Sequence, residues 1–108
     1  MPQPPNMQQL LKQAQKMQQE MMAAQEALKE EVVEASAGGG MVTVKVSGDL
    51  VVKSIRIDPQ AVDPEDVELL QDMVLAAVNE GLRAAQDLAT SRLGRIAGGL
   101  GSLGLPGM

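Results

Sequence analysis

The chain has 108 residues and a net charge of −5, and it contains no cysteine, histidine or aromatic residue. This length suits one domain, and the lack of cysteine excludes disulfides and thiolate metal sites and fits a reducing cytosol. No signal-peptide apolar region follows the first methionine and no apolar run approaches membrane-spanning length, so we expect a cytoplasmic protein with no membrane partner. A core made only of aliphatic side chains favours extra burial against a second copy.

Residues 7 to about 31 predict a long first helix, because they contain neither glycine nor proline and are mostly strong helix formers. Residues 1–6 include three prolines, so we expect them to be flexible, and Asn6 suits a helix N-cap. Apolar residues then recur at alternating spacings of three and four, which indicates a heptad stripe. They are Met7, Leu10, Ala14, Met17, Met21, Ala24 and Leu28.

Three short segments after this helix predict an antiparallel meander. Residues 32–36 are alternating and β-branched, and glycines 38–40 break the chain after them. Residues 41–47 (MVTVKVS) alternate cleanly between apolar and polar side chains. Residues 50–57 (LVVKSIRI) are expected to return as their partner strand.

The connection between the last two strands predicts their register. Gly48-Asp49 is typical of a two-residue hairpin turn. The pairs that follow from this turn are Val46 with Val51 and Val42 with Ile55. Lys53 would then lie on the apolar face opposite Val44, which indicates either a β-bulge or an edge position from which the lysine reaches water.

A second long helix is expected from Pro64 to roughly residue 93. Asp63 suits the N-cap, Pro64 suits the first helical position, and acids follow in the first turn. Gly81 lies inside the apolar stripe at a cost of about 1 kcal/mol relative to alanine, which indicates close packing against another backbone. The glycine-rich residues 98–108 are expected to form a disordered tail.

These elements predict an α+β fold of order α-β-β-β-α, with a three-stranded antiparallel meander flanked by two long helices in a single domain over residues 7–97. The helices would be about 37 Å and 45 Å long, whereas a strand spans roughly 23 Å. The apolar stripes of the helices therefore extend beyond the sheet and must pack on each other or on a second chain, so we expect a homodimer. The expected interface residues are Leu10, Met17, Met21, Val74 and Gly81.

Catalysis has few possible participants in this composition. Without His, Cys or Tyr only carboxylates, lysines and hydroxyls remain, and Asp63 is explained by its capping position. We therefore predict that the protein is not an enzyme and that it has no catalytic residue, metal site, cofactor or small-molecule substrate. Gly99-x-Gly101-x-x-Gly104 matches a dinucleotide fingerprint in its letters, but no strand precedes it and no helix follows it.

The basic residues are the remaining candidates for a binding site. Residues 58–108 hold three basic and eight acidic side chains, so any anion-binding surface must be local and away from the start of the second helix. The candidates are Lys12, Lys16, Lys45, Arg92 and Arg95. One interpretation is that they are solvated side chains and helix-dipole partners. The other is contact with phosphates of duplex DNA, because the lack of aromatic residues disfavours base-stacking modes.

Three segments in this order closely resemble the YbaB/EbfC family of bacterial nucleoid-associated DNA-binding proteins over residues 7–97. They are MQQLLKQAQKMQQEM, GGGMVTVKVSGDLVVKSIRIDP and VDPEDVELLQDMVLAAVNEGLRAAQD. The resemblance implies a dimer with helices projecting like tweezers, which binds double-stranded DNA with limited sequence preference and changes its conformation. It further implies roles in nucleoid organisation, gene regulation and DNA protection. The alternative is an adaptor that docks partner helices on the methionine-rich first helix.

Overall fold

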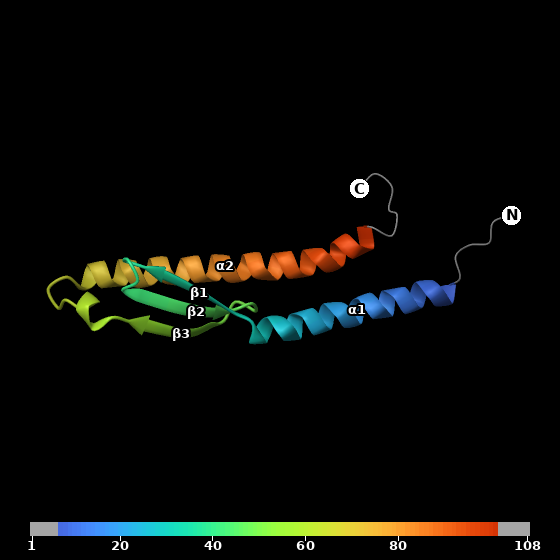
Figure 1. Ribbon diagram of the computed structural model, residues 1–108, viewed down its shortest axis with the longest axis horizontal. Helices are drawn as coiled ribbons and strands as arrows, with labels where there is room; N and C mark the ends of the chain where they lie inside the picture. The colour runs from blue at the N-terminus through green and yellow to red at the C-terminus, as the bar shows by residue number, and fades with distance from the viewer. Residues whose placement is uncertain (1–6, 102–108) are drawn as a thin grey trace.

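The computed structural model describes residues 7–101, in which two helices and a three-stranded sheet make an elongated molecule (Figure 1). The elements are α1 Met7–Glu30, β1 Val32–Ala37, β2 Val42–Ser47, β3 Val52–Ile57, the short 3-10 helix η1 Pro59–Ala61 and α2 Val67–Gly101. The predicted α-β-β-β-α order and α+β class are confirmed. The flexible segment predicted for residues 1–6, with the Asn6 cap, and residues 102–108 of the predicted tail lie outside the described residues.

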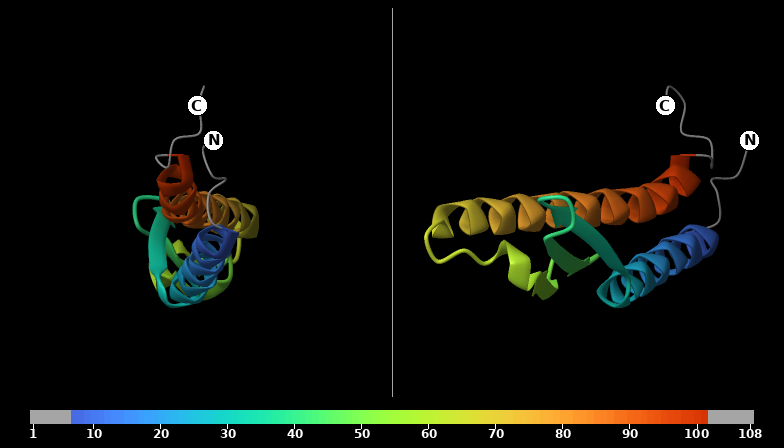
Figure 2. Two further views of the ribbon diagram at one scale, coloured as in Figure 1. Left: turned by 90° about the vertical axis from the view of Figure 1, so that its right-hand side faces the viewer. Right: turned by 60° about the vertical axis from the view of Figure 1, so that its left-hand side comes forward.

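The shape of the molecule follows from its two long helices. Its radius of gyration is 21.1 Å, whereas a compact domain of this length would have about 13 Å. Beyond the sheet, α1 and α2 both extend toward the same end of the molecule (Figures 1 and 2). The sheet supports only the C-terminal end of α1 and part of α2, so the remaining helical surface depends on other contacts.

The sheet has the order β1-β2-β3, with both neighbouring pairs antiparallel and β2 in the centre. One face of β2 is buried beneath α2, which packs mainly on β1 and β2. The strand β3 is exposed along its whole length and its outer edge pairs with no strand among the described residues. The sheet is therefore covered on one side only, and incompletely there.

The register of β2 and β3 differs from the predicted one. The observed pairs are Val42 with Ile57 and Val44 with Ile55, in place of Val46 with Val51 and Val42 with Ile55. The register then shifts, because Lys45 pairs with Ser54 while Val46 pairs with Val52. Lys53 is the extra residue of this β-bulge, which confirms the first of the two explanations for its position.

The turn between β2 and β3 explains the different register. It contains residues 48–51 rather than two residues. The Leu50 amide donates to the Ser47 carbonyl, and the Ser47 amide donates to the Val51 carbonyl, each at 2.9 Å. The Ser47 hydroxyl also donates to the Asp49 carboxylate. Leu50 has a φ of 67°, a left-handed conformation that is costly for a residue with a branched side chain.

The core lies where α2 crosses β2. The fully buried hydrophobic side chains are Val42, Val44, Val46, Ala77 and Ala85. Gly81 sits one helical turn from each alanine, and a Cβ atom on it would lie 2.7 Å from Cγ2 of Val44 and of Val46. Val74 packs against the same cluster. Gly81 therefore gives close approach to valine side chains of the chain's own sheet, where the sequence indicated another backbone.

The start of α2 is three residues later than predicted. Asp66 is the N-cap, because its Oδ1 accepts a hydrogen bond from the Leu69 amide at 3.2 Å. Asp63 instead closes a separate turn: its Oδ1 accepts from the Glu65 amide and its carbonyl accepts from the Asp66 amide, both at 2.9 Å. The predicted cap at Asp63 was wrong. Asp63 and Asp66 are three residues apart and both have side chains that can cap a helix, and the structure uses Asp66.

The end of α2 is also later than predicted. The helix continues to Gly101 rather than stopping near residue 93, so residues 98–101 of the predicted tail are helical. A Cβ atom at Gly94 would meet nothing within 4 Å, so this glycine marks neither a turn nor a close contact. The glycines of this region lower helix propensity without ending the helix.

The buried residues of α1 lie near its C-terminal end. Ala24 and Leu28 are its two buried residues. The Gly48 amide donates to the Leu28 carbonyl at 2.8 Å, which fixes the end of α1 on the β2–β3 turn. The half of α1 that precedes these residues projects away from the sheet (Figure 2). Within the described residues, Met7, Leu10 and Ala14 of its apolar stripe are therefore exposed, and Met17 and Met21 are only half-buried.

Candidate nucleic-acid interface

The predicted cations on the helices lie at the end of the molecule remote from the sheet. Lys12 and Lys16 are exposed and one helical turn apart on α1. Arg95 is exposed near the C-terminal end of α2. Because the N-terminal part of α1 and the C-terminal part of α2 extend the same way, these side chains belong to one end of the molecule (Figure 1).

Arg92, the fourth predicted helix cation, has a structural partner. Its Nη2 atom forms an ion pair with Oε1 of Glu31, the residue between α1 and β1. The side chains of Arg92 and Glu31 are only 35% and 32% exposed. Arg92 was predicted together with Arg95 as a contact for DNA, and the pair shows that it also joins α2 to the residue that follows α1.

The remaining cations divide by whether they have an acidic partner. Lys29 pairs with Glu26 and Arg83 pairs with Glu80, each at 3.3 Å, as exposed neighbours on one helix. Within residues 7–101, the following cations form no ion pair: Lys12, Lys16, Lys45, Lys53, Arg56 and Arg95. These side chains are available for an anion from outside the chain.

The distribution of charge along the chain places these cations in three segments. Residues 7–19 contain two lysines and no acid, and residues 88–101 contain Arg95 and the paired Arg92 but no acid. Residues 41–57, the β2–β3 hairpin, contain Lys45, Lys53 and Arg56 against Asp49 alone. The acidic excess is concentrated elsewhere, above all in residues 58–72. The net charge of −5 therefore conceals three local basic segments.

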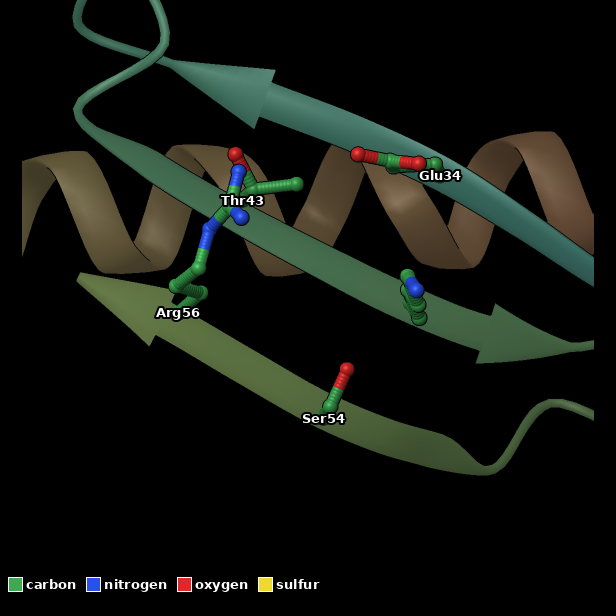
Figure 3. Close-up of a pocket in the computed structure, with 5 residues that line it drawn as sticks. Glu34, Thr43, Ser54 and Arg56 are labelled. Atoms are coloured by element: carbon green, nitrogen blue, oxygen red, sulfur yellow. The ribbon is translucent and has the colours of Figure 1, made fainter. Parts of the chain in front are cut away.

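Apart from the helix cations, a basic surface lies on the face of the sheet that points away from α2. A hollow on this face is lined by Glu34, Thr43, Lys45, Ser54 and Arg56. Figure 3 shows Glu34 on β1, Thr43 on β2, and Ser54 and Arg56 on β3, with α2 behind the sheet. We name this set of five residues the outer sheet face. Lys45 was predicted on a polar face of the hairpin, and it lies there.

Arg56, Ser54 and Thr43 were not among the predicted site residues. A signal for Arg56 was present, because it stands between Ile55 and Ile57 and must therefore point to the opposite face from both. The predicted two-residue turn gave the wrong cross-strand partners, so the juxtaposition of Arg56 with Thr43 was not visible. The position of Arg56 diagonal to Lys45 also follows from the observed register, so it could not be predicted either.

Metal binding and membrane insertion are two other possibilities for a charged, helical chain. In the part of the chain that the structure describes, no three acidic side chains lie together in a way that could hold a metal ion. None of the helices described here is long and apolar enough to cross a lipid bilayer.

The fold and its surfaces define a class of small α+β proteins in which helices project from a one-sided sheet and cations lie on open surfaces. A family model described as the YbaB/EbfC DNA-binding family matches residues 3–100. The chain belongs to this family, which is a DNA-binding family and not an enzyme family. The predicted resemblance is thus confirmed.

Relatives and a solved structure agree with this assignment. Proteins named nucleoid-associated protein from Alkaliphilus metalliredigens and Acetivibrio thermocellus are 54% and 56% identical, with coverage of 94% and 95% of this chain and 89% of each relative. One from Saccharopolyspora erythraea is 54% identical over 96% of this chain and 95% of its own. The crystal structure of an uncharacterized Helicobacter pylori protein is similar with a TM-score of 0.68 and 26% identity, covering 94% of this chain and 100% of that one.

Proposed function

We propose that this member of the family is a nucleoid-associated protein that binds double-stranded DNA as a homodimer and alters its conformation. Nucleoid organisation, gene regulation and DNA protection are the roles that such binding would serve, at the nucleoid in the cytoplasm. The observation that carries the proposal is the family match over residues 3–100, combined with exposed, unpaired cations on the projecting helices. The proposed helix contacts are Lys12, Lys16 and Arg95, with Lys45 on the sheet.

Duplex DNA suits these surfaces better than single strands. The chain has no aromatic residue on which an unpaired base could stack, and such stacking is the main device of single-strand binders. Lysine and arginine side chains on open surfaces instead suit contact with backbone phosphates, which carries no sequence information. We therefore expect binding with little preference among sequences and a strong dependence on salt.

The proposed dimer is supported by apolar surface that the single chain leaves uncovered. On β3, Val52, Ile55 and Ile57 are 37%, 47% and 37% exposed although they continue the buried face of β2. On α1, Leu10 is 47% exposed, and Met17 and Met21 are half-buried. A second copy covering the β3 part of the sheet and the α1 stripe would bury both surfaces.

The expected interface set changes in this proposal. Leu10, Met17 and Met21 remain candidates, whereas Val74 and Gly81 pack on the chain's own core. Ile55 and Ile57 take their place as interface candidates. The conformational change in DNA would follow from this arrangement, since paired helices that grip a duplex from two sides impose their own geometry on it.

The proposal is tested with a salt-titrated binding assay on a duplex and on its single strand, together with a mass measurement of the free protein. The wild-type chain should be a dimer, bind the duplex more tightly, and show a log–log salt slope of about −0.9 per phosphate contacted. Lys12→Glu with Lys16→Glu should weaken binding to all duplexes alike. Absence of any duplex binding at low salt contradicts the proposal.

The matched control for this test is Lys29→Glu with Arg83→Glu. It changes the net charge by the same amount, but at two exposed cations that already have acidic partners. If the control weakens binding as much as the α1 variant, then the effect belongs to overall charge, and Lys12 and Lys16 make no local contact.

The alternative function is an adaptor that docks partner helices on α1. The observation in its favour is the exposure of Met7, Leu11 and Met22 at 72%, 58% and 60%. Methionine-rich surfaces adapt readily to different partners. Purification of the protein with a stoichiometric protein partner and without DNA would favour this function over the first.

A further inference from the structure

We infer that the outer sheet face is a second phosphate-binding surface, which contacts the backbone of duplex DNA independently of the helix cations. The inference rests on the proposed binding of duplex DNA and extends it to a surface on the opposite side of the sheet from α2. It adds Arg56 and Ser54 to Lys45 as contact residues.

The register of the sheet builds the surface. Lys45 lies across from Ser54, and Arg56 lies across from Thr43. The two cations therefore occupy diagonal positions on neighbouring strands, with α-carbons about 7–8 Å apart. The guanidinium of Arg56 extends over Thr43, its cross-strand partner (Figure 3). Ser54, an exposed hydroxyl, precedes Arg56 by two residues on the same face of β3 and lies beside Lys45.

The cations on this surface lack an acidic partner among the residues that the structure describes. Lys45 and Arg56 form no ion pair with any residue in the described range 7–101. Glu34 is the cross-strand neighbour of Lys45 on β1, but the two side chains are not ion-paired. One carboxylate against two cations leaves a net positive surface. The hairpin that carries it holds three cations and one acid, whereas the whole chain is acidic.

The chemistry of the surface selects the partner. Lysine, arginine and serine side chains are all common donors to phosphate oxygens, and the fork of an arginine matches a phosphate with two parallel hydrogen bonds. The surface contains neither an aromatic platform for bases nor an apolar centre for a protein partner. An open arrangement of donors suits a repeating backbone, and the duplex offers phosphates at regular intervals.

The location of the surface leaves it free in the proposed dimer. The uncovered apolar side chains Ile55 and Ile57 share the face of β3 that continues the buried face of β2, and Arg56 between them points the other way. A second copy that covers the apolar face therefore does not need the outer face. Each dimer would present two such surfaces.

The test compares two variants of the full chain with equal changes in net charge. Lys45→Gln with Arg56→Gln removes the proposed donors, and Lys29→Gln with Arg83→Gln removes two cations that have acidic partners. For each outer sheet face that contacts the duplex, the first variant should have a salt slope that is shallower by about 1.8, because two fewer phosphates are neutralised there. Its deficit in affinity relative to wild type should accordingly be larger at 50 mM salt than at 200 mM, by about 12-fold for each contacting face. The second variant should keep the wild-type slope.

A third variant should change the affinity for duplex DNA in the opposite direction. Glu34→Gln removes the one carboxylate of the outer sheet face and should tighten duplex binding by roughly two- to five-fold, as expected for one exposed charge. Melting followed by circular dichroism confirms that each variant is folded. Equal slopes and affinities for the Lys45/Arg56 variant and its control, or unchanged or weaker binding by Glu34→Gln, would overturn the inference. Wild-type binding that persists in that case leaves the proposed function intact, whereas absent wild-type binding removes both.

Discussion

Arg92 of α2 is ion-paired with Glu31, the residue that connects α1 to β1, across 61 positions of sequence. The second carboxylate oxygen of Glu31 is buried and has no hydrogen-bond partner within the described residues. The pair therefore joins the second helix to the point at which the first helix leaves the sheet. Together with the burial of Ala24 and Leu28 and the hydrogen bond from Gly48 to Leu28, this contact helps to set the direction in which α1 projects.

Loss of this pair should reduce stability more than DNA affinity. Arg92→Met leaves a largely buried carboxylate without its cation, and we expect the free energy of unfolding to fall by about 1–3 kcal/mol. Urea unfolding at one fixed protein concentration measures the change. Arg83→Met is the control, because its exposed pair with Glu80 should contribute less than about 1 kcal/mol. An Arg92→Met protein of unchanged stability but reduced duplex affinity would show that Arg92 is a DNA contact instead.

Gly81→Ala should destabilise the protein despite the gain in helix propensity. The added methyl group would lie 2.7 Å from methyl carbons of Val44 and Val46, and such overpacking costs about 1–3 kcal/mol, against a propensity gain of about 1 kcal/mol. Gly94→Ala is the matched substitution in the same helix, where nothing lies within 4 Å. It should stabilise by up to about 1 kcal/mol. Thermal melts of both variants decide this, and equal shifts in Tm would contradict the packing argument.

Leu50→Asn should stabilise the β2–β3 turn. Leu50 has a φ of 67°, which costs a branched side chain about 1–2 kcal/mol, and asparagine tolerates this conformation better. We expect a gain of about 1 kcal/mol in urea unfolding. Val51→Asn serves as the control, since Val51 does not have a positive φ. A loss of stability on Leu50→Asn would indicate instead that the half-exposed leucine packs against a second copy.

Ile55→Asp should convert the proposed dimer to a monomer. The substitution places a charge in the middle of the uncovered apolar face of β3, where a partner would have to bury it without a counter-ion. Sedimentation or light scattering gives the mass. Ser54→Asp, one residue away on the opposite face, should leave the mass unchanged. If both Ile55→Asp and Ser54→Asp remain dimers, the interface does not lie on β3.

Much of the fold was predictable because it depends on patterns local in the chain. The alternation of β2 and the absence of glycine and proline in α1 indicated both elements, and spacing by three and four indicated the apolar stripe of α1. Lys53 stood out as a break in alternation and proved to be a bulge. The boundaries of α2 were less accurate, since Asp63 and Asp66 both suit a cap and only packing selects one.

The order of elements, the apolar faces and the family could be derived from residue type and spacing, because each of these is a property of one chain read in order. The contacts between distant residues could not be derived in this way and became visible only in the folded chain. A four-residue turn replaced the expected two, and that shift in register placed Arg56 opposite Thr43 and diagonal to Lys45. Likewise Arg92 forms an ion pair with Glu31, and Gly81 packs closely on Val44 and Val46, because helix α2 crosses segments far away in sequence. Such pairings depend on how elements pack, and no local pattern encodes the partner.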